Sequence, residues 1–254
     1  METDFIPRVI PVLLLKGKGL YKGKEFKNHK YVGDPINIVK IFNDKEVDEL
    51  VFFDIEATLR SEINYNFLKE IAGECFMPLS YGGGINSLNQ IQKIIHSGVE
   101  KVFINSAAIE NLKFISDAVT EFGSSTICVC IDYKKNFFGK RIVYKRNASQ
   151  KTLLDPHIWA KQLEEIGVGE IILQNINADG NLTGYDFEYF NELKKSIGIP
   201  LIIAGGSKGL EDFKTAIENY KIHNMAGGAC FIYYGVHRAV LVSYPEIKQL
   251  YKWD

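Results

Sequence analysis

The strongest constraint on the fold of this chain is an internal repeat. Three segments of the first half recur in the same order in the second half. In residue numbers, the pairs are 34–35 with 155–156, 47–57 with 168–178, and 78–84 with 200–206. The offset is 121 for the first two pairs (155 − 34 and 168 − 47) and 122 for the third (200 − 78). One match of this kind could arise by chance, but three in nearly the same register predict two similar half-chains.

Within each half, short β-rich apolar runs alternate with amphipathic stretches. The apolar runs lie near residues 9–15, 50–55, 77–81, 101–104, 126–132, 170–174, 200–204 and 225–230. Helical periodicity marks residues 34–43, 63–74, 88–97, 112–122, 156–166, 186–197, 210–220 and 245–251. The alternation predicts a parallel sheet covered by helices, and eight units predict an α/β fold, a (β/α)8 TIM barrel built from two half-barrels. We expect residues 1–254 to form a single barrel domain.

An open doubly wound sheet is the alternative architecture. That fold usually has fewer strands and binds nucleotides through a glycine fingerprint. Gly17 and Gly19 begin such a pattern, but Lys22 stands where the third glycine belongs, and no Walker A motif is present. The closed barrel is therefore favoured.

The composition excludes several classes of protein. With 30 basic and 31 acidic residues the net charge is −1, whereas nucleic-acid binders carry a basic face. No apolar run approaches the ~18 residues needed to cross a bilayer, and residues 1–8 lack the apolar core of a signal peptide. Four cysteines are too few for a disulfide scaffold. We expect a cytoplasmic protein with neither a nucleic-acid partner nor a membrane association.

Glycines recur after the third and seventh apolar runs, where a barrel of this type has its site. Glycine lets backbone N–H groups approach an anion closely, and the helices that follow add positive N-termini. A lone glycine pair more often makes a tight turn, but the repeated placement favours two phosphate cradles and a substrate with a phosphate at each end. The cradle residues are Gly83, Gly84, Asn105 and Ser106 in the first half, and Asp179, Gly180, Gly205, Gly206, Ala229 and Cys230 in the second.

A basic loop follows the first apolar run and contains Lys16, Lys18 and Lys22. It could be a mobile lid that binds an anionic substrate, with Lys22 among its contacts, or an ordinary solvated loop. The sequence favours neither interpretation.

Asp132 closes the fifth apolar run and is a candidate general acid or base. A purely structural hydrogen-bonding role is equally compatible with the sequence. The repeat aligns Asp132 with Leu14 at the end of the first run, and leucine cannot transfer protons. The chain therefore has one central carboxylate at this position rather than a symmetric pair.

Charged residues mark the starts of four apolar runs, and these starts converge at the opposite end of a closed barrel. Two acids and two bases there could form an ionic ring. Ordinary salt bridges at the rim, which contribute little to stability, are the alternative. The four residues are Arg8, Glu49, Lys101 and Glu170.

Cys128 and Cys130 lie two residues apart on one predicted strand and so share a face. No CxxC pair or histidine cluster accompanies them. We therefore expect buried free thiols, with no metal site and no cofactor. Residues 136–145 predict a short hairpin inserted after the fifth strand.

Eight motifs together identify a family. They are Arg-Val-Ile-Pro at residues 8–11, Gly-Asp-Pro at 33–35, Asp-Glu-Leu at 48–50, Tyr-Gly-Gly-Gly-Ile at 81–85, Ile-Asn-Ser-Ala-Ala at 104–108, Ile-Asp at 131–132, Ala-Asp-Gly-Asn-Leu-Thr-Gly-Tyr-Asp at 178–186 and Ala-Gly-Gly at 204–206. The chain resembles the cyclase subunit of imidazole glycerol phosphate synthase over nearly its whole length. The resemblance implies a two-half (β/α)8 barrel that binds a bis-phosphate substrate. It also implies that ammonia enters through the barrel from a glutaminase docked at the bottom. The implied gate over this path consists of Arg8, Glu49, Lys101 and Glu170.

Four positions depart from the family pattern. The family has catalytic aspartates at the ends of the first and fifth strands; Asp132 matches the second, but Leu14 replaces the first. Cys230 replaces a serine in a phosphate site. Near the mouth, Ser125 replaces a glutamine and Asn177 replaces an aspartate. Loss of one carboxylate should lower cyclase activity by several orders of magnitude.

Three further segments, at residues 11–15, 31–37 and 75–79, resemble a paralogous branch associated with acetamidino modification of surface sugars. This resemblance implies an enzyme subunit, lyase-like in family, that supplies nitrogen to a nucleotide-linked N-acetyl sugar in lipopolysaccharide or related glycans. The implied partners are a glutaminase and a sugar amidotransferase. Two alternatives remain open: a genuine cyclase of histidine biosynthesis that tolerates Leu14, and a non-catalytic conduit or scaffold for the glutaminase.

Overall fold

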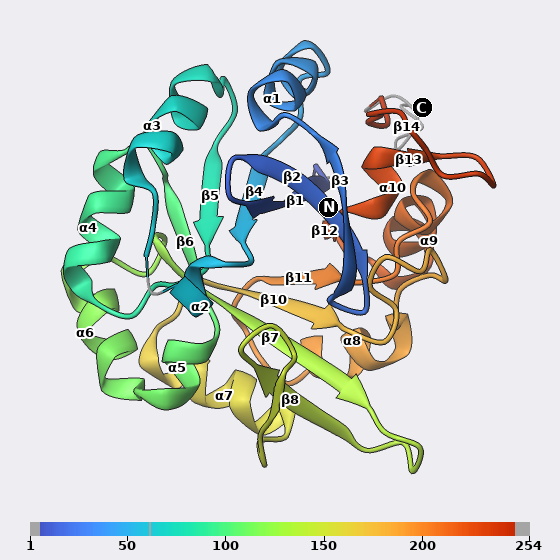
Figure 1. The fold of residues 1–254 in the computed structure, drawn as a ribbon. Helices are drawn as coiled ribbons and strands as arrows, with labels where there is room; N and C mark the ends of the chain where they lie inside the picture. Colours follow the sequence, from blue (N-terminus) through green and yellow to red (C-terminus); the bar gives the residue numbers. More distant parts are fainter. Residues whose placement is uncertain (1–5, 61, 247–254) are drawn as a thin grey trace.

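The computed structural model describes residues 6–60 and 62–246, in which eight parallel strands close into a barrel surrounded by helices (Figure 1). The barrel strands are β1 (Arg8–Lys16), β4 (Leu50–Asp54), β5 (Leu79–Gly82), β6 (Lys101–Ile104), β7 (Ile127–Lys135), β10 (Glu170–Asn175), β11 (Leu201–Ala204) and β12 (Asn224–Gly227). They follow one another in this order around the barrel. The parallel pairings of β6 with β7 and of β12 with β1 join the two halves. The predicted (β/α)8 barrel is confirmed.

Helices cover the outside of the strands. They are α1 (Pro35–Asp44), α2 (Ala57–Arg60), α3 (Tyr65–Glu74), α4 (Leu88–His96), α5 (Ser106–Glu110), α6 (Leu112–Phe122), α7 (Pro156–Ile166), α8 (Phe187–Lys194), α9 (Leu210–Tyr220) and α10 (Ala229–Ile232). The first seven predicted helical stretches match these helices to within a few residues. The eighth, 245–251, does not begin as predicted, because residues 245 and 246 are not helical; its remainder lies outside the described residues.

The repeat has a physical basis at the starts of α1 and α7. The Asp34 carboxylate accepts a hydrogen bond from the backbone N–H of Asn37 at 3.0 Å, and that of Asp155 accepts one from His157 at 2.9 Å. Proline follows both aspartates at the beginning of the helix. An N-cap carboxylate satisfies an otherwise free N–H group, and proline is pre-shaped for the first turn. Residues that are 121 positions apart therefore occupy equivalent places at the starts of corresponding helices.

Two of the barrel strands continue beyond the barrel as hairpins. The end of β1 pairs antiparallel with β2 (Gly19–Lys24), which pairs with β3 (Lys27–Gly33). The end of β7 pairs with β8 (Arg141–Lys145), and β8 pairs with β9 (Gln150–Lys151). The predicted hairpin at 136–145 is therefore longer than expected, because β7 itself supplies its first strand. A small pair, β13 (Tyr233–Tyr234) with β14 (Ala239–Val240), follows α10.

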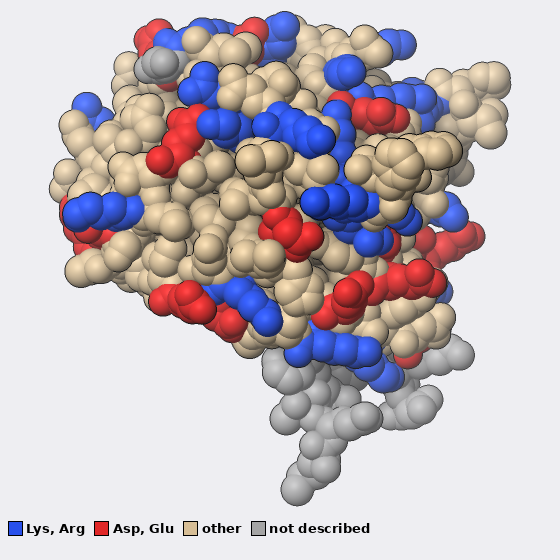
Figure 2. Space-filling view, turned by 90° about the horizontal axis from the view of Figure 1, so that it is seen from below, with Lys and Arg blue, Asp and Glu red and all other residues tan. Residues whose placement is uncertain are grey.

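The apolar core has two layers. One lies between strands and helices, and the other fills the barrel interior. The interior cluster comprises Ile10, Val51, Phe103, Cys128, Cys130, Ile172, Ile202, Ala204 and Ala226, with Val12 and Phe53 packed against it. In the part of the chain that the structure describes, no helix is long and apolar enough to cross a membrane. Acidic and basic side chains are interspersed over the face drawn in Figure 2, in keeping with the net charge of −1.

Candidate functional site

A cavity of about 320 Å³ opens at the carboxyl ends of the barrel strands. Each of the eight strands, or the residue directly after it, contributes to its wall. The predicted site residues that line it are Lys22, Gly83, Gly84, Asn105, Ser106, Asp132, Asp179, Gly180, Gly205, Gly206 and Ala229. Cys230 does not line it, because its side chain on α10 packs beside Gly227 and Ser207.

Gly83 and Gly205 occupy equivalent places in the two half-barrels. Their φ angles are +115° and +88°, a region that a β-carbon disfavours. A β-carbon on Gly83 would lie 2.3 Å from the carbonyl oxygen of Asp54, and one on Gly205 would lie 2.4 Å from that of Asn175. The two carbonyl residues differ by the repeat offset, since 175 − 54 is 121. Only glycine lets each loop pass so close to the end of the neighbouring strand. Without a side chain, the backbone of each glycine is accessible at the cavity wall.

The predicted first cradle includes a cation, Arg146, that sequence reasoning missed. Ser106 begins α5, and its Oγ accepts a hydrogen bond from the backbone N–H of Arg146 at 2.9 Å. Arg146 lines the cavity, and its side chain pairs with Glu110 at 3.1 Å. Because the segment after β8 folds back over the mouth, no spacing along the sequence would have placed Arg146 here.

Lys22 lies in the predicted second cradle. The expectation that it belongs to a loop was wrong, whereas Lys16 and Lys18 of the same segment are exposed. Lys22 lies within β2 and is only 4% exposed. The Nζ of Lys22 lies 3.4 Å from the carbonyl oxygen of Val12. A β-carbon on Gly228 would lie 1.9 Å from the same Nζ. Burial lowers the pKa of Lys22, while the charges of Asp179 and Cys230 act in the opposite direction. A buried ammonium group at a glycine-lined wall is suited to an anion.

Asp132 lines the cavity and is buried. Its carboxylate accepts a hydrogen bond from Asn105 Nδ2 at 3.1 Å. Burial, and secondly the charge of Asp179, raise the pKa of Asp132 to about 7. A carboxyl group with this pKa can both accept and donate a proton near neutral pH. Leu14 lines the same cavity and adds no titratable group.

Asp54 and Gln174 are among the polar cavity residues that were not predicted. Asp54 ends β4, and its Oδ1 accepts from the N–H groups of Glu56 and Ala57 at 3.0 and 2.9 Å; burial raises its pKa. The rule that selected Asp132, a carboxylate ending a barrel strand, would also have found Asp54. Gln174 Nε2 donates to Asp179 Oδ1 at 3.1 Å. No signal in the sequence marked Gln174.

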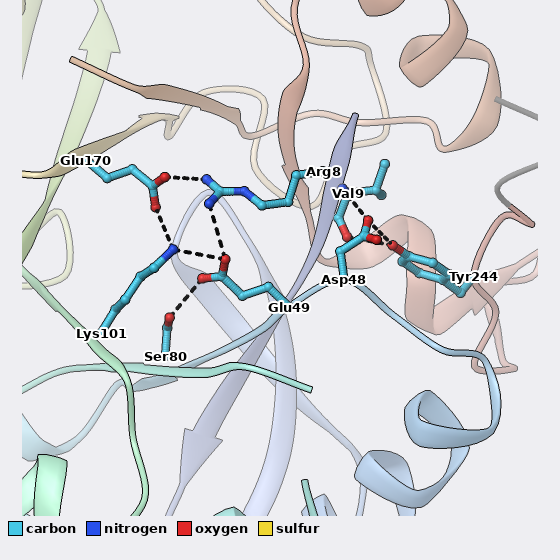
Figure 3. A network of polar contacts seen from close by, with 8 residues as sticks. All are labelled: Arg8, Val9, Asp48, Glu49, Ser80, Lys101, Glu170 and Tyr244. Carbon is cyan, nitrogen blue, oxygen red and sulfur yellow. Dashed lines mark hydrogen bonds and ion pairs between the residues drawn. The ribbon is translucent and has the colours of Figure 1, made fainter. Parts of the chain in front are cut away.

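At the opposite end of the barrel, four charged side chains meet in a closed ring (Figure 3). Arg8 pairs with Glu49 at 3.4 Å and also with Glu170. Lys101 pairs with Glu49 at 3.2 Å and with Glu170 at 3.4 Å. Ser80 Oγ donates to Glu49 at 2.8 Å. The side chains of the two acids are 3% and 8% exposed, so each buried carboxylate is shared between both bases rather than paired at an exposed rim.

An apolar column connects this ring to the cavity. Cys128, Cys130 and Asp132 are every second residue of β7 and therefore share one face of the strand. They span about 13 Å along it. Burial raises the pKa of both thiols, so they are neutral at pH 7. The rings of Phe53 and Phe103 meet edge to face at 6.1 Å and form part of the cavity wall.

Two of the positions that depart from the family pattern lie at opposite ends of the barrel. Ser125 is exposed and precedes β7 at the ring end, so the expectation that it lies near the mouth was wrong. Asn177 follows β10 at the mouth, where its Oδ1 accepts a hydrogen bond from the backbone N–H of Lys135 at 2.9 Å.

Comparison with known proteins places this geometry in a family. Residues 8–237 match the family model for "Histidine biosynthesis protein". "Imidazole glycerol phosphate synthase subunit HisF" of Alkaliphilus metalliredigens is 34% identical over 95% of this chain and 94% of its own length. The chain belongs to the HisF-like family of cyclase subunits. Another HisF-like protein, "Putative imidazole glycerol phosphate synthase subunit hisF2" of Pseudomonas aeruginosa, is 45% identical over 96% of this chain and 97% of its own length.

Within the HisF-like frame, the arrangement has three chemical parts. The ring end offers a neutral cluster of two acids and two bases. The mouth offers two glycine-lined walls, each with one cation, Arg146 or Lys22. Between the walls, Asp132 is a carboxyl group able to exchange a proton at neutral pH.

Proposed function

We propose that this HisF-like barrel receives ammonia from a glutaminase docked at the ring end and delivers it to an anionic substrate in the cavity. The observation that carries the proposal is the apolar column that joins the closed ring to the cavity wall. Neutral ammonia can enter an apolar column, whereas the ammonium ion would lose its hydration there at a large cost. The ring is therefore the point at which ammonium from bulk solvent is excluded.

The proposed substrate is a nucleotide-linked N-acetyl sugar, and the proposed product carries an acetamidino group for a surface glycan such as lipopolysaccharide. Leu14 supports this assignment, because it occupies the place in the cavity wall where the resemblance expects the first of the two catalytic aspartates of histidine biosynthesis. The resemblance of residues 11–15, 31–37 and 75–79 to the acetamidino branch supports it as well.

The amidine reaction needs a partner beyond the glutaminase. Ammonia forms a bond to the acetyl carbon, the acyl oxygen leaves, and water is the net by-product. Activation of that oxygen is assigned to a sugar amidotransferase partner. Asp132, with a pKa of about 7, would take up the proton that the attacking nitrogen releases.

A genuine cyclase is the second candidate. It is favoured by the two glycine-lined walls and by the buried Asp132 between them. To separate the candidates, the purified chain is mixed with the bis-phosphate substrate of the histidine-pathway cyclase and an ammonium salt. We expect no cyclisation by the wild type, and a measurable rate after Leu14→Asp. Wild-type turnover of ~1–10³ s⁻¹, as is typical of enzymes, would overturn the proposal.

A pure conduit is the third possibility and is tested with Asp132→Asn. In the reconstituted sugar amidination system, we expect this variant to lose activity about 10²-fold or more, the range typical of a lost general acid or base. Unchanged amidination would show that the barrel only carries ammonia.

A further inference from the structure

The β7–β8 hairpin projects away from the barrel and beyond the surrounding helices (Figure 1). At its tip, Phe137 and Phe138 are 98% and 90% exposed. Their rings lie edge to face at 5.8 Å. Two large aromatic side chains held together in water mark an interaction surface rather than part of the core.

The chain around this tip is strongly basic. Residues 133–154 contain seven basic residues and no acidic one, a net +7 in a chain of net charge −1. Arg141 pairs with Asp186, and two others pair with Glu110. Lys135, at the end of β7, and Lys140, directly before β8, flank the two phenylalanines and are exposed. The tip therefore combines an apolar point with cations on both sides.

The tip is held in one shape by its own hydrogen bonds. Asn136 Oδ1 accepts from the backbone N–H groups of Phe138 at 3.0 Å and Lys140 at 2.9 Å. The backbone N–H of Asn136 donates to the carbonyl of Lys140 at 2.9 Å. Because the backbone of the tip is already ordered, the aromatic pair can contact a partner surface without a further loss of backbone entropy.

We propose that this hairpin tip docks on an anionic phospholipid surface, with Phe137 and Phe138 in the interface and Lys135 and Lys140 at the lipid phosphates. The tip is convex, and a fluid interface accepts a convex apolar point without a matching pocket, which a protein partner would have to supply. The two lysines lie two to three residues from the rings, or about 7–10 Å along an extended chain. This matches the ~5–10 Å to which apolar faces enter the headgroup boundary.

This contact replaces the expectation of no membrane association, which rested on the lack of a spanning segment. A peripheral contact needs no such segment, and two weak signals, apolar and basic, are enough for reversible binding. The proposal is independent of the proposed function, because it requires neither ammonia nor a glutaminase.

The test is co-sedimentation of the full chain with vesicles of phosphatidylethanolamine and phosphatidylglycerol, compared with vesicles of phosphatidylcholine alone. We expect partition into the anionic vesicles that weakens as salt is added. Phe137→Ser with Phe138→Ser should lower the partition coefficient at least about tenfold. Lys135→Gln with Lys140→Gln should lower it by about tenfold as well.

Matched controls come from the same chain. Phe76→Ser removes an aromatic side chain that is 86% exposed elsewhere on the molecule. Lys69→Gln with Lys214→Gln removes two exposed charges from the outer helices α3 and α9. Both controls should bind anionic vesicles as the wild type does. Failure of the wild type to bind these vesicles, equal binding to both vesicle types, or equal losses in the controls would overturn the proposal. The proposal would also be overturned if the phenylalanine variant bound the vesicles as the wild type does and differed only in self-association. The tip would then be a contact with a second copy of the chain.

Discussion

Replacing Lys101 with methionine tests whether the ring is a buried network or a set of surface ion pairs. Lys101 pairs with Glu49 at 3.2 Å and with Glu170 at 3.4 Å. At an effective dielectric constant of about 20, each pair has a Coulomb energy of about 5 kcal/mol. The ammonium group regains hydration on unfolding, which offsets most of this sum. We expect Lys101→Met to lower the free energy of unfolding by about 2–4 kcal/mol, because two buried carboxylates would share one remaining cation.

Urea unfolding followed by tryptophan fluorescence measures this change, with linear extrapolation to water. Lys113→Met is the matched control, since Lys113 pairs with Asp117 at 2.7 Å on the surface and its side chain is 80% exposed. The control should change stability by no more than about 0.5 kcal/mol. Equal effects of the two substitutions would refute the reasoning, since the ring would then behave as an exposed set of ion pairs.

Three further predictions concern the cavity and its walls. The raised pKa of Asp132, about 7, means that the folded state binds the proton more tightly than the unfolded state, so its contribution to stability falls as pH rises from about 4 to about 7. Asp132→Asn should therefore be stabilised relative to the wild type by on the order of 4 kcal/mol at pH 8 and by little at pH 4, as urea titrations at both pH values would show; a pH-independent difference would contradict this. Gly205→Ala should lower the free energy of unfolding by about 2–4 kcal/mol, because its β-carbon would meet the Asn175 carbonyl at 2.4 Å, whereas Gly73→Ala in α3 meets nothing and should be neutral or slightly stabilising in thermal unfolding. The four cysteines should react slowly with a thiol reagent at pH 8 in the native chain and fully after unfolding, because burial raises the pKa of each thiol; rapid native reaction of Cys128 or Cys130 would show that the barrel interior is open to solvent.

The sequence predicted those parts of the molecule that depend on periodicity and on strand ends. Apolar runs and the recurring Asp-Pro pairs at 34–35 and 155–156 define the half-barrels, since both are local signals. The convergence of the four charged residues was predictable because the starts of parallel strands meet in any closed barrel. The sequence left open whether they form a ring or separate ion pairs at the rim. The same reasoning places Asp132 and the glycines at the mouth.

The missed features depend on hairpins that fold back over the barrel. Lys22 looked like a loop residue, but the pairing of β2 with β1 and β3 turns it inward. Arg146 reaches the cavity only because the chain after β8 returns across the mouth. The exposure of Phe137 and Phe138 is likewise a consequence of how far β7 extends beyond the barrel. Such placements come from tertiary pairing, which residue spacing does not encode.

The measurement that tests the central claim most directly is an isotope competition. The chain, its glutaminase and the sugar amidotransferase are supplied with glutamine carrying an amide nitrogen-15 label, in the presence of excess unlabelled ammonium. If ammonia travels from the ring through the apolar column, the amidine product keeps the glutamine label, and Glu49→Gln, which opens the ring, dilutes it. A wild-type product whose label equals that of the bulk ammonium would show that ammonia reaches the cavity through solvent, and would contradict the account.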